Sequence, residues 1–158
     1  MPLREVSMFA GGTAEWGRQL PIGNEVRTVC YGADLMTRLS VADGNKYMRT
    51  VFIGMDKVRP DGSDIWGEES GGFGHFRMED IHTGDSLLGH IDWRVEDGQD
   101  FGTFHFDEGS GYWKGVSGAM PNVQLDWCTR ESDGSLASGE PIMLLAFIEG
   151  RGSLDFPA

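Results

Sequence analysis

Three of the four histidines in this chain recur at fifteen-residue intervals, at His75, His90 and His105, and each lies in a segment typical of a β-strand. Between the last two comes Asp97-Gly98, a pair that favours the type I′ turn of a two-residue hairpin because both residues tolerate φ > 0. A hairpin closed by this turn places His90 directly opposite His105 on neighbouring antiparallel strands. The histidine spacing therefore predicts a sheet with imidazoles gathered on one face.

The turn that precedes His90 leaves two registers open. A loop at 82–83 places His75 opposite His90, whereas a loop at 83–84 places His75 opposite Asp92. Both registers keep His75 on the face of the other imidazoles, because side chains alternate between the two faces along a strand.

Alternation along residues 72–107 divides the predicted sheet into an apolar, aromatic face and a polar face that carries the histidines. Burying one large apolar side chain contributes about 1.5–3 kcal/mol, so we expect the aromatic face to line a barrel interior or an oligomer interface. Glycines on that face leave volume for a cavity. The aromatic face consists of Gly74, Phe76, Met78, Gly89, Ile91, Trp93, Val95, Gly102, Phe104 and Phe106.

Turn signals, including four Asp-Gly pairs, separate short segments rich in β-branched and aromatic residues along the whole chain. No 3.6-residue apolar stripe persists for three turns, so helix is expected only as a short turn at 33–41. We expect a single domain over 1–158, with a loose N-terminal arm at 1–24 and an irregular tail at 150–158. The spacing predicts an all-β antiparallel barrel or a sandwich. The strands are expected at 25–32, 47–56, 64–69, 72–80, 87–96, 100–107, 111–117, 122–130 and 141–149.

Charge and hydropathy restrict the partners that this chain is expected to have. It has 25 acidic and 13 basic residues, a net charge of -12, which argues against nucleic acid and anionic membrane surfaces because both attract clustered Lys and Arg. No apolar run reaches the roughly 18 residues of a membrane span, and the first residues lack the apolar core of a secretory signal. We therefore expect a cytoplasmic protein in which Cys30 and Cys128 are buried free thiols.

The segment from Phe104 to Gly118, FHFDEGSGYWKGVSG, resembles the F-x-x-G-[ST]-G-x-[aromatic]-x-G-x-x-G hairpin of the allene oxide cyclase and dirigent barrels. The stretches Phe52–Asp56 and Pro60–Gly62 have a similar character, so the resemblance covers about residues 47–118. It implies an eight-stranded antiparallel barrel, calycin-like or allene-oxide-cyclase-like, with a central cavity and often trimeric. It also implies a cofactor-free role in cyclisation or coupling of a small hydrophobic molecule, but it transfers no functional side chain to this sequence.

The polar face combines imidazoles, carboxylates and guanidinium groups, which together have the chemistry for proton transfer in an isomerisation or cyclisation. A hydrophobic substrate would lie against the aromatic face. The predicted catalytic residues are His75, His90, Asp92, Arg94 and His105. The predicted ligand-binding residues are Met78, Trp93, Phe104 and Phe106.

These residues predict a cyclase or isomerase that needs no cofactor and no metal, acts on a small hydrophobic or aromatic molecule in a barrel cavity, and forms a homotrimer or homodimer. Two alternatives stay open: a non-catalytic small-molecule-binding barrel, and a metal-dependent enzyme that uses the three histidines. Three strands span roughly 10 Å between the outer two, so three imidazoles would have to converge steeply on one ion. Alternating polar residues are also what the solvated or subunit-facing side of an antiparallel sheet ordinarily carries.

Overall fold

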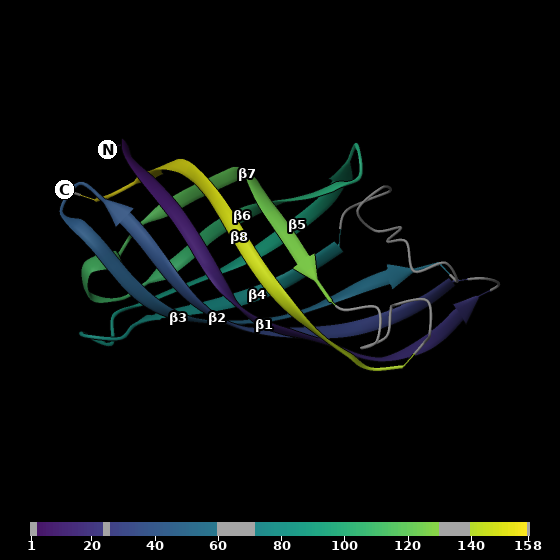
Figure 1. Ribbon diagram of the computed structural model, residues 1–158. Helices are drawn as coiled ribbons and strands as arrows, with labels where there is room; N and C mark the ends of the chain where they lie inside the picture. The colour runs from purple at the N-terminus through teal and green to yellow at the C-terminus, as the bar shows by residue number, and fades with distance from the viewer. Residues whose placement is uncertain (1–2, 24–25, 60–71, 130–139, 158) are drawn as a thin grey trace.

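The computed structural model describes residues 3–23, 26–59, 72–129 and 140–157, and these form a closed eight-stranded antiparallel barrel (Figure 1). Each strand pairs with the next along the chain, and the first pairs with the last, so the predicted all-β barrel is confirmed. A short 3₁₀ helix connects the sixth and seventh strands. The strands are Leu3–Gly23 (β1), Val26–Val41 (β2), Gly44–Val58 (β3), Gly72–Asp80 (β4), Ser86–Glu96 (β5), Gln99–Gly109 (β6), Ser117–Cys128 (β7) and Ile142–Asp155 (β8).

Side chains alternate between the barrel interior and its outer surface, and β4 alternates residue by residue along its whole length. Inside, the ring centroid of Phe104 lies 5.4 Å from that of Phe76 and 5.6 Å from that of Phe52. All three side chains are 4 % exposed or less. The predicted aromatic face therefore lines the interior, apart from the half-buried Val95, and the histidine face is the outer wall.

Neighbouring side chains fill the space at the glycines where the sequence predicts a cavity. A Cβ atom at Gly74 would lie 2.7 Å from the hydroxyl oxygen of Tyr31, and one at Gly89 would lie 2.5 Å from Cζ of Phe76. Gly102 is crowded in the same way by an aliphatic side chain. Because interiors pack to crystal-like density, larger neighbours occupy the volume that these glycines leave. The cavity expected at these three positions is therefore absent there.

Within the arm expected to be loose at 1–24, residues 3–23 instead form the strand β1, which pairs with β8 over Leu3–Trp16 and with β2 over Ser7–Gly23. Its inward positions include Ala10 and Ala14, each 1 % exposed, so small residues make the alternation inconspicuous. The helical turn expected at 33–41 is also wrong, because these residues continue β2 with the same alternating burial.

Two further boundaries differ from the expectation. The predicted strand at 111–117 is mostly a 3₁₀ helix and turn, where Gly111 and Gly115 have φ values of +57° and +77°. Such values are incompatible with an extended strand. The tail expected to be irregular at 150–158 continues β8 as far as Asp155, which lies opposite the first residue of β1. Both ends of the chain therefore meet at one end of the barrel (Figure 1).

Cys30 and Cys128 are free thiols as expected, but both are exposed rather than buried, because they occupy outward positions of β2 and β7. The strand predicted at 64–69 lies outside the described residues. Within the described part of the chain, no helix has the length and apolar character needed to cross a bilayer.

Candidate functional site

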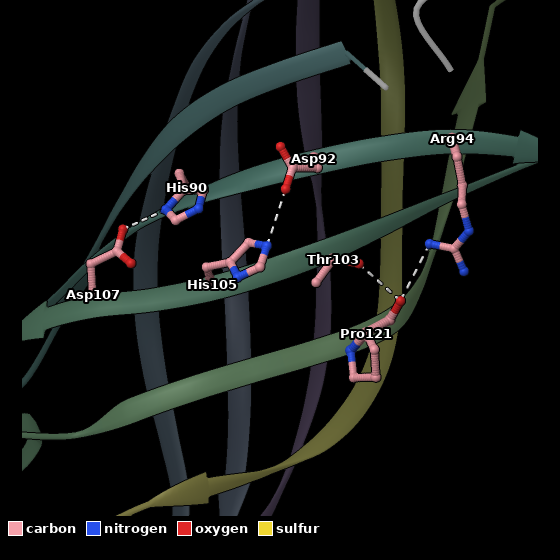
Figure 2. Close-up of polar contacts among 7 residues, drawn as sticks. All are labelled: His90, Asp92, Arg94, Thr103, His105, Asp107 and Pro121. Atoms are coloured by element: carbon pink, nitrogen blue, oxygen red, sulfur yellow. Dashed lines mark hydrogen bonds and ion pairs between the residues drawn. The ribbon is translucent and has the colours of Figure 1, made fainter. Parts of the chain in front are cut away.

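The β5–β6 hairpin brings two imidazoles into contact on the outer wall. Asp97 and Gly98 have φ values of 50° and 77°, as the predicted type I′ turn requires. His90 lies opposite His105, and their rings stack with centroids 4.3 Å apart and planes 7° apart (Figure 2). The predicted pairing of these two histidines is confirmed.

His75 lies opposite His90 across the β4–β5 pair, which confirms the first of the two predicted registers. The loop is longer than two residues, and the carboxylate of Asp80 accepts hydrogen bonds from the backbone N–H groups of His82 and Thr83 at 2.8 and 3.2 Å. The ring centroids of His75 and His90 are 6.5 Å apart with planes inclined by 52°. His75 therefore stands beside the stacked pair without joining it.

Each stacked imidazole has its own carboxylate. Nδ1 of His90 lies 2.6 Å from Oδ2 of Asp107, and Nε2 of His105 lies 3.1 Å from Oδ2 of Asp92 (Figure 2). The four side chains are 33–58 % exposed, so water reaches the cluster and the rings have room to turn. The cluster is thus an open site on the outer wall, not part of a closed pocket.

Asp107 is a site residue that sequence reasoning missed, because it reads as half of a solvated acidic pair. A β-bulge brings it to the histidines: Leu88 pairs with Glu108, while the next residue, Gly89, pairs with Phe106. Asp107 is the extra residue of the bulge, and bulges redirect the side chain that they carry. Its position two residues after His105 is compatible with the histidine face, but the bulge that turns it toward His90 has no signal in the sequence.

His90, Asp92 and His105 together offer one potential metal-ligand atom each, and these atoms lie within 4.8 Å of one another. Two ligands about 2.1 Å from one ion lie about 3.0–3.4 Å apart at octahedral or tetrahedral angles. The 3.1 Å separation of His105 Nε2 and Asp92 Oδ2 already falls in that range. The remaining separations need to shorten by less than about 2 Å, which rotation about the broad χ2 of histidine supplies.

Arg94, another predicted catalytic residue, uses its guanidinium within the protein. Nε donates to Glu96 Oε1 at 2.7 Å, Nη2 donates to Asn122 Oδ1 at 2.6 Å, and Nη1 donates to the Pro121 carbonyl oxygen at 3.3 Å. Thr103 Oγ1 donates to the same carbonyl at 3.1 Å (Figure 2). Arg94 therefore ties β5 to β7 at one side of the histidine cluster.

The predicted ligand-binding residues lie on the other side of the sheet. Met78, Trp93, Phe104 and Phe106 are 1, 7, 0 and 2 % exposed inside the barrel. Trp93 packs edge-on against Tyr31, with ring centroids 5.0 Å apart. The structure thus divides the predicted site into an outer polar group and an inner aromatic group, separated by the barrel wall.

A buried polar group that sequence reasoning also missed lies inside the barrel, at the end away from the chain termini. Asp56 and Gln19 are 1 % and 9 % exposed, and both lie opposite Val29, on the two sides of β2. The Tyr31 hydroxyl lies over Gly54, two residues before Asp56 on the same inner face. The alternation of Phe-x-Gly-x-Asp at the end of β3 is the signal for an inward carboxylate.

Compared with protein-family models, curated proteins and solved structures, the chain matches none of them. The resemblance to the allene oxide cyclase and dirigent barrels therefore stays a prediction.

Proposed function

We propose that this barrel binds one divalent transition-metal ion on its outer wall through His90, Asp92 and His105, and acts as a metal-dependent enzyme. The observation that carries the proposal is the gathering of one ligand atom from each side chain within 4.8 Å. Two imidazoles and one carboxylate suit zinc or ferrous iron and leave coordination positions open for water or substrate. Two histidines and an aspartate replace the three histidines considered from the sequence.

The carboxylate of Asp107 supports this assignment. Imidazoles that bind a metal through one nitrogen commonly donate the other N–H to a carboxylate, which fixes the ring orientation. His90 Nδ1 is the nitrogen next to Asp107, so Nε2 is left for the ion. In His105, an ion would take the place of the hydrogen bond between Nε2 and Asp92.

Charge and neighbouring apolar surface support both cation binding and a small substrate. A chain with a net charge of -12 raises the local concentration of cations. Phe73 lies opposite Asp92 and is 46 % exposed, and Ile53 lies opposite His75 and is 68 % exposed. A bound ion would supply Lewis-acid chemistry to an oxygen of the substrate. The apolar pair would hold its hydrocarbon part, in keeping with the small hydrophobic or aromatic substrate expected from the sequence.

Titration of the purified full chain with Co²⁺ and Zn²⁺ tests the proposal, by calorimetry and by the visible spectrum of bound cobalt. We expect one ion per chain, and we expect His90→Ala and His105→Ala each to weaken binding by about tenfold or more. His82→Ala is the matched control, because it removes an exposed imidazole from the β4–β5 turn and should leave the affinity unchanged.

Asp107→Asn keeps all three proposed ligands and is expected to weaken binding by about 10–100-fold, as for other carboxylates behind a metal-bound histidine. The proposal is wrong if His82→Ala weakens binding as much as His90→Ala does. It is also wrong if the wild-type chain does not bind one ion per molecule.

A second candidate is the cofactor-independent isomerase expected from the sequence, and the buried carboxylate of Asp56 favours it. The backbone N–H of Lys57 donates to Oδ1 of Asp56 at 2.8 Å, so this buried carboxylate is held in a fixed position. General acid–base chemistry in a water-excluded site is typical of isomerases. Trp16 and Tyr31, with ring centroids 5.1 Å apart, provide an aromatic surface in the same end of the barrel. Loss of turnover in Asp56→Asn, with full turnover in His90→Ala and in chelator, would select this candidate.

A further inference from the structure

The outer wall has a hollow of about 510 Å³ over β1 and its two neighbours β2 and β8, and no residue of the histidine cluster lines it. It adjoins an irregular part of the barrel, since β7 and β8 are out of register between Gly118 and Gln124. Asn122 and Gly150 line the hollow at this irregularity. The register shift between β7 and β8 therefore borders the hollow on one side. The outward side chains of β1 form its floor.

Two arginines that have no carboxylate partner among the described residues line this hollow. Arg38 on β2 lies over the ring of Phe9 at 5.9 Å, and Arg151 is on β8. Within the described ranges, neither guanidinium forms an ion pair or a hydrogen bond with another residue. By contrast, Arg77 on β4 is paired with Glu79 at 2.9 Å. Unpaired arginines are unexpected in a chain where 25 acidic residues outnumber 13 basic ones. The N–H donors of both guanidinium groups are therefore available to a ligand.

Strand pairing arranges these arginines around two hydroxyl groups and an aromatic ring. Ser7 on β1 lies opposite Arg151 on one side and opposite Ser40 on the other. Phe9, the next outward residue of β1, lies opposite Arg38 and is 44 % exposed. The hollow thus has a polar end around Ser7 and an apolar surface at Phe9.

We propose that this hollow binds a small organic anion with a flat apolar body, of the class of aromatic carboxylates. Arg38 and Arg151 lie on strands two apart and are offset by two residues, so their Cα atoms are about 12 Å apart across β1. Two extended arginine side chains bridge that distance, and each matches a carboxylate with paired N–H donors. The carboxylate lies between the two guanidinium groups and accepts from the Ser7 hydroxyl, while the ring packs against Phe9.

Glu149 is the one acidic side chain among the described residues that line the hollow, and it lies opposite Phe9 on β8. The Glu149 carboxylate repels an anion, so it weakens the binding of ligands whose negative charge lies near Phe9 and β8. Removing this charge in Glu149→Gln is expected to raise the affinity for an anion by about threefold, as for one exposed charge pair.

The test uses benzoate as the probe, with inorganic phosphate and benzylamine in separate arms, and follows amide chemical shifts of the full chain by NMR. Benzoate is expected to bind saturably and to shift Ser7 and Phe9, whereas benzylamine, with a similar ring and the opposite charge, is expected not to bind. Arg38→Gln and Arg151→Gln are each expected to weaken benzoate binding by about tenfold or more. Arg77→Gln is the matched control, with an expected change below about twofold.

Phe9→Ala separates the contribution of the ring from that of the charge, because it should weaken benzoate binding and leave phosphate binding unchanged. Four results would overturn the proposal: no saturation by benzoate, the same shifts with benzylamine, equal weakening by Arg77→Gln, or binding of phosphate without benzoate. Thermal melting checks that each variant folds. If Arg151→Gln does not fold, Arg151→Lys takes its place, because lysine keeps the charge and loses the paired donors. Arg151→Lys is expected to weaken benzoate binding by about threefold.

Discussion

Replacement of Phe104 by alanine measures how tightly the barrel interior is filled. The side chain is 0 % exposed, and its ring centroid lies 5.4 Å from that of Phe76 and 5.6 Å from that of Phe52. Truncation removes these contacts and leaves a void, and buried Phe→Ala changes cost about 3–5 kcal/mol of unfolding free energy. For a domain of this size each kcal/mol lowers Tm by about 2–4 °C, so we expect Tm to fall by about 6–20 °C.

Phe101→Ala is the matched control on the same strand, because alternation places Phe101 on the outer wall, half-buried, with the Arg94 guanidinium 5.7 Å from its ring centroid. An exposed cation–π contact contributes about 0.5–1 kcal/mol, so this variant should lose under about 1.5 kcal/mol. Urea unfolding and calorimetry measure both losses. If Phe104→Ala costs no more than Phe101→Ala, the inward assignment of the aromatic face and the packed interior are both refuted.

Three further outcomes are expected from changes elsewhere in the barrel. Gly98 has a φ of +77°, a backbone conformation that strains any residue with a Cβ atom. Gly98→Ala should therefore lower the free energy of unfolding by about 1 kcal/mol and Tm by about 2–4 °C, and an unchanged Tm would contradict this turn geometry. Burial, together with the hydrogen bond that the Tyr112 hydroxyl donates to Asp43 at 2.8 Å, raises the pKa of Tyr112. A raised pKa stabilises the folded state at pH values below the ordinary tyrosine range, and this contribution is lost as pH rises through the folded-state pKa. Tyr112→Phe should therefore flatten the fall in urea stability above about pH 10, and an equal fall in both proteins would contradict that role. Leu145 is 53 % exposed on the outer side of β8, an apolar position suited to packing between the subunits of the expected homo-oligomer. Leu145→Asp should therefore lower the molar mass measured by light scattering. An unchanged oligomer mass would exclude the outer side of β8 as the subunit interface.

Hairpin chemistry made the centre of this sheet predictable. A two-residue type I′ turn at Asp97-Gly98 permits one register for β5 and β6, so the pairing of His90 with His105 followed directly from the sequence. The β4–β5 register was predictable only to within two choices, because the loop signal at 82–85 is spread over several turn-forming residues.

The strands β1 and β2 were harder to recognise because small or polar residues occupy several inward positions in the middle of each strand. Ala10, Ala14 and Ala33 are buried where a strand pattern would ordinarily show large apolar residues, and Thr37 is buried through a 2.7 Å hydrogen bond to Thr50. Small inward side chains leave room for the aromatic residues of other strands. The residue pattern of β1 or β2 alone therefore gives little indication of a strand. The small inward residues are explained only by how the whole closed barrel packs.

The candidate site was predictable in part. Alternation placed His90, Asp92 and His105 on one face, but the role of Asp107 depends on a bulge that breaks alternation at one residue, and no spacing rule announces it. Asp56 was missed for the opposite reason, because an inward carboxylate contradicts the expectation that acidic residues face solvent.

Anomalous diffraction at the zinc edge, from crystals grown with Zn²⁺, shows directly whether the histidine pair of the β5–β6 hairpin holds an ion on the outer wall. We expect one strong peak about 2.0–2.2 Å from His90 Nε2, a carboxylate oxygen of Asp92 and His105 Nε2. A peak at His82 without these ligands, or no peak at a zinc concentration that saturates the chain in solution, would contradict it.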